Sequence, residues 1–348
     1  TTFTRKHEWE NKSGEVNATV RQLHEYGFRT SFWTRSSADG RYVGNGGGTA
    51  GRSTITDLIK GLDIKVDASY DPGFFPDNSG FVFQGTGNGA GFCTMALLDA
   101  GPTEITFNEP ECVGVRGVAL YQHVGAGLGG GDYFVINSQF VSDNGGHGTT
   151  LSDPRATFGP GSKIKITPML FDGTNYKPLE PISLETPYEG DSVLSPSSTM
   201  LAARLAGPES KQIGYVLRKV IATPAGSNYA VSVPQTGRIC LKGAKPNFSF
   251  DERFIVTHHY LEEGDWASRG FASADDPAFK ALRDKGVSDI YIADLLTGKK
   301  VRVTNMPAGV YALFPHFRSD GWFYFSVRDS NDNKEYLAAS DAALRLAK

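Results

Sequence analysis

Residues 310–339 read VYALFPHFRSDGWFYFSVRDSNDNKEYLAA, which is three apolar runs separated by two polar turns. The first turn, residues 318–321, ends in Asp-Gly, and glycine readily adopts the positive φ that tight hairpin turns require. The run that follows, residues 322–327, is apolar and alternates, as expected for a strand with one buried face. The segment therefore predicts three antiparallel strands joined by short turns.

Five upstream segments repeat this pattern of a strand, a turn rich in Ser, Pro, Asp and Gly, and a second strand. Their turns lie at residues 37–40, 76–78, 125–132, 195–197 and 250–252. A third strand follows each pair, and often a fourth. Repeats of roughly 40 to 70 residues with up to four strands fit or exceed the usual length of a β-propeller blade. We therefore expect an all-β chain that forms a six-bladed β-propeller.

Residues 289–304 (DIYIADLLTGKKVRVT) and 314–329 (FPHFRSDGWFYFSVRD) follow the order of strands and turns in a TolB-type repeat. The chain resembles this family of WD-repeat-like propellers, most clearly over residues 287–329. The third repeat departs from the pattern because its turn is a run of glycines. The resemblance implies a recognition scaffold in a periplasmic or secreted protein.

One domain, residues 1–348, is expected to contain all the repeats. Its blades are predicted at residues 24–66, 67–110, 116–185, 188–236, 238–305 and 310–348. The last repeat has little chain left for a fourth strand, and either residues 2–9 or residues 16–23 would supply it. Pairing between the two chain ends would close the ring and remove its open sheet edges.

Residues 275–286, DDPAFKALRDKG, predict one helix, with acidic residues at its start, Pro in its first turn and Gly at its end. The helix lies between the second and third strands of the fifth repeat. Irregular stretches at residues 45–52, 84–91 and 142–162 occupy the same place in other repeats. We expect these insertions on one rim of the central channel, as a lid over its mouth.

The net charge of −3, with 35 basic and 38 acidic residues, argues against a nucleic-acid partner. No apolar run is long enough to cross a bilayer. The chain starts at Thr1 with no visible signal peptide, as a processed precursor or a trimmed chain would, and we expect a periplasmic or secreted monomer. Cys93 and Cys112 would pair in an exported protein, or else remain buried free thiols.

Polar side chains are expected to gather at the channel mouth, where they would bind a small polar or anionic ligand or a protein partner. The ligand-binding candidates are Arg29, Tyr70, Asp71, Arg116, Glu189, Arg204 and Arg328. The catalytic candidates are His24, His123 and His258, and a divalent metal would be held by His123, His258 and Glu189. A histidine beside a carboxylate suits proton abstraction near neutral pH.

Two functions stay open from the sequence. One is a non-catalytic recognition scaffold. The other is a metal-assisted lyase or hydrolase with a histidine base. This second function is supported only by an analogy to propeller lyases. Structural roles compete with both: His258 and His259 are adjacent on a strand and face opposite ways. His316 is expected to pack between blades, and the aspartates of the turns to bond the local backbone.

Overall fold

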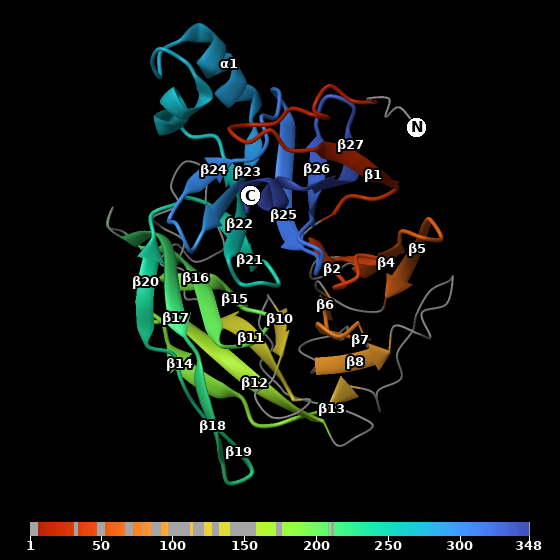
Figure 1. Cartoon of the computed structure of the whole chain (residues 1–348), viewed down its shortest axis with the longest axis vertical. Coiled ribbons are helices and arrows are strands. Elements are labelled where there is room, and N and C mark those ends of the chain that lie inside the picture. The colour runs from red at the N-terminus through yellow and green to blue at the C-terminus, as the bar shows by residue number, and fades with distance from the viewer. Residues whose placement is uncertain are drawn as a thin grey trace.

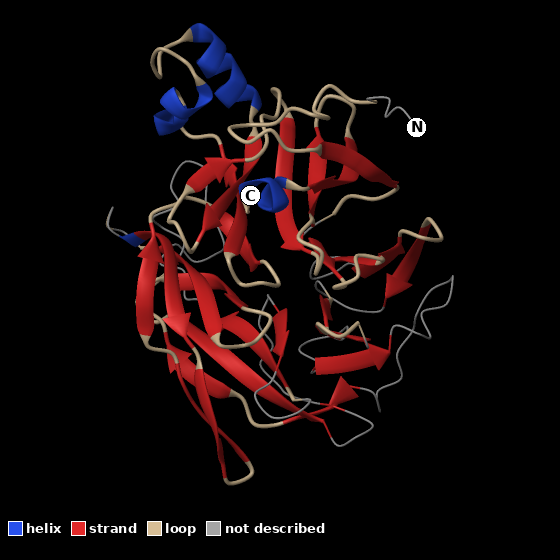
Figure 2. Cartoon of the chain, viewed as in Figure 1, coloured by secondary structure: helices blue, strands red, loops and turns tan. Residues whose placement is uncertain are grey.

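The computed structural model describes residues 6–30, 34–46, 53–66, 72–78, 80–84, 92–96, 112–113, 122–126, 132–139, 158–171, 176–207, 209 and 212–347. Antiparallel strands make up most of this part of the chain (Figure 2). The prediction of a mostly β chain is therefore confirmed. None of the described helices is long and apolar enough to cross a membrane.

The strands fall into six groups in chain order, and each group begins with a strand near the middle of the molecule. The first group is β2 (Thr34–Ser36), β3 (Tyr42–Asn45), β4 (Ser53–Asp57) and β5 (Leu62–Val66). The second is β6 (Gly73–Phe74), β7 (Gly80–Gln84), β8 (Phe92–Ala96) and β9 (Cys112–Val113). The third is β10 (Gln122–Ala126), β11 (Tyr133–Gln139) and β12 (Lys163–Phe171), whose outer side pairs with β13 (Tyr176–Pro178) and β14 (Ile182–Glu185).

The fourth group is β15 (Glu189–Leu194), β16 (Met200–Ala206), β17 (Ile213–Lys219) and β20 (Gln235–Ile239), with a separate hairpin of β18 (Ile221–Ala225) and β19 (Asn228–Ser232). The fifth is β21 (Ala244–Phe248), β22 (Phe254–Tyr260), β23 (Ser288–Asp294) and β24 (Lys300–Arg302). The sixth is β25 (Val310–Phe317), β26 (Phe323–Asp329), β27 (Lys334–Ser340) and β1 (Val20–Tyr26). A parallel contact between Ser288 and Tyr311 links the last two groups into one sheet.

In Figure 1 the first strands β2, β6, β10, β15, β21 and β25 lie around the middle of the view, and later strands of each group lie farther out. This arrangement is propeller-like. Within each group, the first strand begins at one end of the group and the turn that follows it lies at the other end, because the first two strands pair antiparallel. We call these two ends the mouth end and the turn end.

The predicted turn of the first group is held by its own side chains. Asp39 accepts hydrogen bonds from the Ser37 hydroxyl at 2.6 Å and from the Arg41 amide at 3.0 Å. The Arg41 guanidinium contacts Asp57, the last residue of the third strand, at 2.8 Å. The prediction that turn aspartates bond the local backbone is confirmed here and at Asp320, which accepts from the Trp322 amide.

The fifth group repeats this network in a distant part of the chain. Asp251 accepts from the Ser249 hydroxyl at 2.5 Å and from the Arg253 amide at 3.2 Å. The Arg253 guanidinium contacts Asp294 at 2.8 Å. The same short sequence pattern thus produces the same hairpin geometry in two groups.

The helix predicted at residues 275–286 is confirmed as α1 (Pro277–Lys285). Asp276 caps it by accepting from the Ala278 amide, and Gly286 ends it with φ of 86°. The short helices η5 (Glu263–Asp265) and η6 (Ala267–Arg269) precede it, and α2 (Ala342–Leu346) lies near the C-terminus. In Figure 1, α1 lies beyond the outer side of the fifth group and not over the middle, so this insertion does not form the expected lid.

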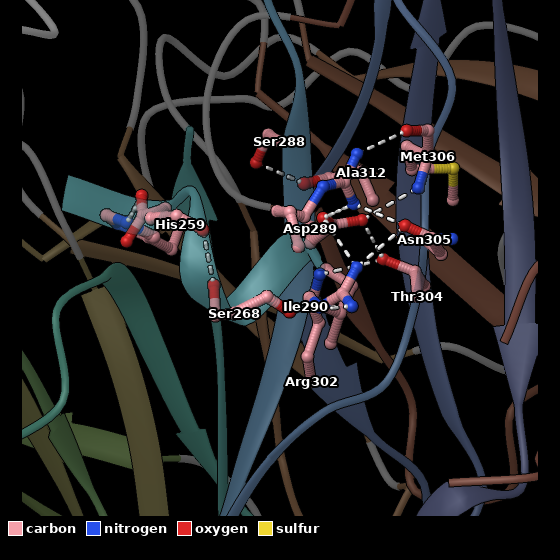
Figure 3. Close-up of polar contacts among 12 residues, drawn as sticks. His259, Ser268, Ser288, Asp289, Ile290, Arg302, Thr304, Asn305, Met306 and Ala312 are labelled. Carbon is pink, nitrogen blue, oxygen red and sulfur yellow. Dashed lines mark hydrogen bonds and ion pairs between the residues drawn. The ribbon is translucent and has the colours of Figure 1, made fainter. Parts of the chain in front are cut away.

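Buried ion pairs hold the helical segment on the fifth group (Figure 3). The Asp289 carboxylate accepts from the Arg269 guanidinium at 2.5 Å, and from the Thr304 hydroxyl and the Met306 amide at 2.8 Å each. His259, on the same face of the group, contacts Asp265 at 2.8 Å. Because a carboxylate taken out of water needs such partners, we interpret this cluster as structural.

The N-terminal segment lies against the fifth and sixth groups. Ser13 bridges to Thr304, and the Gly14 amide donates to the Val303 carbonyl. β1 then pairs with β27, from Val20 opposite Ser340 to Tyr26 opposite Glu335. Residues 16–23, one of the two segments predicted to supply the fourth strand of the last repeat, overlap β1. β1 continues past residue 24, where the first blade was expected to begin. The two chain ends therefore share one group of strands.

Candidate functional site

The first strands of the fourth, fifth and sixth groups share one irregularity. Asp191, Lys245 and Phe314 each have a positive φ, of 46°, 55° and 54°. At each of them the pairing with the second strand shifts register, as in a β-bulge. A bulge turns its side chain away from the regular alternation of a strand. This brings the Asp191 carboxylate to 2.6 Å from the Lys245 ammonium group of the next strand group.

The second cation on Asp191 is Arg204 of β16, at 3.2 Å. The Arg204 guanidinium also lies 5.5 Å from the centre of the Phe158 ring, where it makes a cation–π contact. Asp191 is 3% exposed. Burial alone would raise the pKa of its carboxyl group, but Lys245 and Arg204 together hold this pKa below its usual value. We call Asp191, Arg204 and Lys245 the charge cluster.

His258 lies next to the charge cluster and is neutral at pH 7. Its side chain is 1% exposed, and burial together with the Lys245 charge lowers its pKa to about 3. Its Nδ1 atom accepts the Phe314 amide hydrogen at 3.3 Å, so the ring proton is on Nε2. His259 points to the other face of β22 and contacts Asp265, as the alternation of strand side chains predicts. His258 therefore connects the fifth and sixth groups.

Two further arginines gather near the mouth end, around Glu335. Arg328 donates to the Glu335 carboxylate at 2.8 Å and to the Thr30 carbonyl at 2.9 Å. Arg29 lies 3.7 Å from the same carboxylate, and its side chain is 75% exposed. The structure thus brings two of the predicted ligand-binding residues onto one carboxylate.

Tyr260 connects this pair of arginines with the charge cluster. Burial raises its pKa, while the nearby charges of Arg328 and Arg204 act in the opposite direction. Its ring lies 5.5 Å from that of His258 and 6.1 Å from that of Tyr311, the second residue of β25. Arg204, His258 and Arg328 therefore all lie near Tyr260. We call these four residues, together with Arg29, the mouth site.

Other predicted residues have local partners. Glu189 is held by two hydrogen bonds from Arg218 of the same group, at 2.5 and 3.0 Å. His24 lies on β1, three strands away from β25, with its Nε2 atom 3.3 Å from Asp63 of the first group. The structure does not bring these two residues together with His258. In the part of the chain that the structure describes, no three His, Cys, Asp or Glu side chains gather as metal ligands.

The remaining candidates are not tested. Tyr70, Asp71 and Arg116 lie outside the described residues, and of His123 only the backbone, in β10, is described. Cys93 and Cys112 are directly opposite one another on β8 and β9. Cα atoms of such antiparallel partners are about 4.5 to 5.5 Å apart, a spacing that a disulfide spans, so their pairing stays a prediction.

Sequence analysis missed Lys245 as a site residue, although a signal was present. Lys245 and Phe314 each precede a proline, Pro246 and Pro315, inside a strand. Proline within a strand marks an edge or a bulge. These two prolines indicate where the first strands leave regular pairing. The partner of Lys245 could not be predicted, because Asp191 lies in another strand group.

No protein-family model matches the chain, and no curated protein sequence does. Similar solved structures include the β-propeller domain of Myceliophteria thermophila Cps50 (Swd1), with a TM-score of 0.46 and 9% identity over 92% of this chain and 99% of that one. TolB from Acinetobacter baumannii has a TM-score of 0.42 and 14% sequence identity, over 82% of this chain and 56% of that one. Pyrococcus horikoshii acylaminoacyl peptidase has a TM-score of 0.40 and 11% sequence identity, over 92% of this chain and 45% of that one. At these low scores the likenesses carry nothing about function, which is inferred from geometry.

Proposed function

We propose that the chain is a single-domain, six-bladed β-propeller closed by β1, and that it acts as a recognition scaffold. The six strand groups and the pairing of β1 with β27 support this architecture. Direct contacts between the first and sixth groups support closure: the Thr34 hydroxyl lies 2.5 Å from the Ser326 hydroxyl, and the Tyr324 hydroxyl donates to the Gly40 carbonyl at 2.8 Å. These contacts support a ring because they join the first group to the last.

The ligand that we propose for the mouth site is anionic. The observation that carries this is the pair of guanidinium groups, Arg29 and Arg328, on the single carboxylate of Glu335. Arg204 adds a third guanidinium charge near Tyr260. Guanidinium groups bind carboxylates and phosphates with two parallel hydrogen bonds, and exposed Arg29 is accessible for this contact.

Calorimetric titration with citrate and with inorganic phosphate tests this proposal. Replacing Arg29 by Ala or Arg328 by Gln is expected to weaken citrate binding about tenfold, which corresponds to about 1.4 kcal/mol. Lys299→Ala is the matched control, since Lys299 is an exposed cation in the turn after β23. Binding that also weakens with added salt would support an electrostatic site. Citrate binding that is equal in all variants, or absent, would refute the proposal.

The enzyme alternative gains no support from the mouth site. A general base works best when its pKa is near the working pH. The pKa of His258 is lowered to about 3, and its Nδ1 atom already accepts the Phe314 amide hydrogen. We therefore retain recognition as the proposed function, without a catalytic step.

A further inference from the structure

An open groove lies between the sixth and first strand groups, at their turn ends. Its volume is about 530 Å³, which is within the range of pockets that hold small organic ligands. The sixth group supplies one wall from β1 and β26, and the first group supplies the other from two of its turns. We call it the seam groove, and its described lining is Leu23, Asp39, Gly40, Arg41, Leu58, Ile59 and Tyr324.

Three aliphatic side chains line the seam groove. Leu23 has no partner on β27 and is the extra residue of a β-bulge in β1, where its side chain is exposed. Ile59, in the turn after β4, is 76% exposed, and Leu58 beside it is partly buried. A ligand with an apolar chain would remove this exposed aliphatic surface from water, which favours binding.

The fifth group contains a matching turn whose surroundings are packed. Residues 57–61 (DLIKG) correspond to residues 294–298 (DLLTG), and in both turns Oδ1 of the aspartate accepts the amide hydrogen two residues later, at 3.0 and 2.9 Å. Leu296 is 77% exposed, much like its counterpart in the first group. Leu295, however, packs with Met200 of the fourth group on one buried cluster. The first-group turn instead borders the sixth group across the seam groove.

Asp39 supplies a carboxylate to the seam groove. Its Oδ1 atom accepts from the Ser37 hydroxyl at 2.6 Å and from the Arg41 amide at 3.0 Å, and its own amide donates to the Asn78 side chain at 3.0 Å. These contacts fix the position of the carboxylate. Within the described residues, no donor reaches its second oxygen, Oδ2, and no cationic side chain pairs with it.

The nearby cations already have carboxylate partners. Arg41 is the only cation of the described lining, and its Nε and Nη2 atoms donate to buried Asp57 at 3.3 and 2.8 Å. Arg318, which donates to the hydroxyl of the groove's tyrosine, also donates to Asp320 at 2.6 Å. Three carboxylates therefore face two guanidinium groups, and the charge of Asp39 is left without a partner. This charge favours a cationic ligand.

We propose that the seam groove binds a small aliphatic amine in its ammonium form. The aliphatic chain would contact Leu23, Leu58 and Ile59, and the ammonium group would donate to Oδ2 of Asp39. An ammonium group carries donors only, so it matches an acceptor that lacks a donor. The seam groove lies at the turn end and would take a cation, so it does not require the mouth site to bind anything.

Titration of the full chain with hexylamine at pH 7, followed by NMR, tests the proposal. Hexanol is the neutral probe of nearly the same shape, and hexanoate is the anionic one. Hexylamine should bind about fivefold more tightly than hexanol, a difference typical of one exposed ion pair, and hexanoate should bind most weakly. Equal binding of hexylamine and hexanoate, or no binding of hexylamine at millimolar concentration, would overturn the proposal.

Asp39→Asn is the variant that tests the charge. Asparagine keeps an oxygen for the Ser37 hydroxyl and the Arg41 amide, so the turn should be retained. We expect hexylamine binding to weaken about fivefold, to the level of hexanol, while hexanol binding changes little. Asp251→Asn is the matched control, because Asp251 makes the same two local contacts in the fifth group. Equal hexylamine binding in the two variants would refute the assignment of Asp39.

Ile59→Ser is the variant that tests the apolar wall. Ile59 is exposed, so the substitution should not affect folding, but it removes apolar surface from the groove. Binding of hexylamine and of hexanol should weaken together, by at least about threefold. Leu296→Ser is the control, since Leu296 has the same place in the matching turn. An effect of Leu296→Ser as large as that of Ile59→Ser would refute the site.

Crossing the variants separates the seam groove from the mouth site. Arg29→Ala should leave hexylamine binding unchanged, and Asp39→Asn should leave citrate binding unchanged. If Asp39→Asn weakens both ligands equally, the seam groove is not a separate site and the proposal fails.

Discussion

The turn ends of the first and fifth strand groups are alike, whereas the mouth ends of the fourth and fifth groups differ. In the first group Arg41 lies 2.8 Å from Asp57 and 4.7 Å from the Tyr42 ring centre. In the fifth group Arg253 lies 2.8 Å from Asp294 and 4.8 Å from the Phe254 ring centre. Two segments more than two hundred residues apart therefore build one geometry at this end.

At the mouth end, the fourth and fifth groups have little in common. Residues 207–212 connect β16 to β17, whereas residues 261–287 connect β22 to β23 and contain α1. Some charges there are paired between groups, as Asp191 and Lys245 are, and others within one group, as Asp191 and Arg204 are. Contacts between groups occur at both ends, since at the turn end the Ser197 amide donates to Glu252 of the next group. The comparison indicates that the repeated Arg–Asp network is local to each group, whereas Asp191 joins charges of two groups.

The largest effect is expected from Asp191→Ala at the mouth end. Removing this carboxylate leaves Lys245 and Arg204 partly buried without their common partner, which should lower the free energy of unfolding by about 3 to 5 kcal/mol. Asp251→Ala at the turn end removes an exposed carboxylate and should lower it by about 1 kcal/mol or less. Urea unfolding followed by fluorescence measures both. A loss in Asp191→Ala no larger than in Asp251→Ala would remove the distinction between the two ends.

A smaller effect is expected from Arg41→Ala and Arg253→Ala. Each variant removes one copy of the repeated turn-end network, so both should lower the melting temperature by similar amounts. The two positions lie in different strand groups and share no partner, so the double variant should show the sum of the two shifts. Differential scanning calorimetry measures the melting temperatures of the three variants. If one variant melts like the unchanged protein, the two networks are not equivalent.

The smallest effect is an acid-dependent loss of stability at the turn end. The hydrogen bond from Arg253 lowers the pKa of Asp294 to about 2, below the value of about 3.9 in an unfolded chain. Asp294 therefore stabilises the folded state above about pH 4, and this contribution is lost as the pH falls towards 2. Arg253→Ala should show a shallower loss of stability over this window. Equal slopes of the urea midpoint against pH would contradict the assignment.

Turns and the helix could be predicted from the sequence because local residues determine them. The Asp-Gly turn at residues 320–321 and the capped helix α1 depend on neighbours within a few positions. The mouth site depends on contacts between segments far apart in sequence. His24 was expected at the mouth, yet β1 pairs with β27 at the outer side of the sixth group. The alternation of apolar and polar residues in a strand does not indicate which other strand it pairs with.

Two candidate residues lie at the strand ends where the sequence analysis expected them. Arg204 and Arg328 lie near the ends of second strands, as expected, and both are close to Tyr260. The bulge at Lys245 changes the direction of its side chain, and alternation fails there. His258 is a second case in which the surroundings change the outcome. A histidine suggests a general base, but burial lowers the pKa of His258 to about 3.

A disulfide between the first and sixth groups tests most directly whether the strand groups surround one axis. Thr34→Cys and Ser326→Cys would be combined in a chain whose native cysteines, Cys93, Cys112 and Cys240, are replaced by Ser. Because these two hydroxyls lie 2.5 Å apart, we predict rapid cross-linking under mild oxidation, seen as faster migration in a non-reducing denaturing gel. Ser249→Cys with Ser326→Cys serves as the control pair and should not cross-link. No cross-link in the first pair, or equal yields in both, would contradict the closed arrangement.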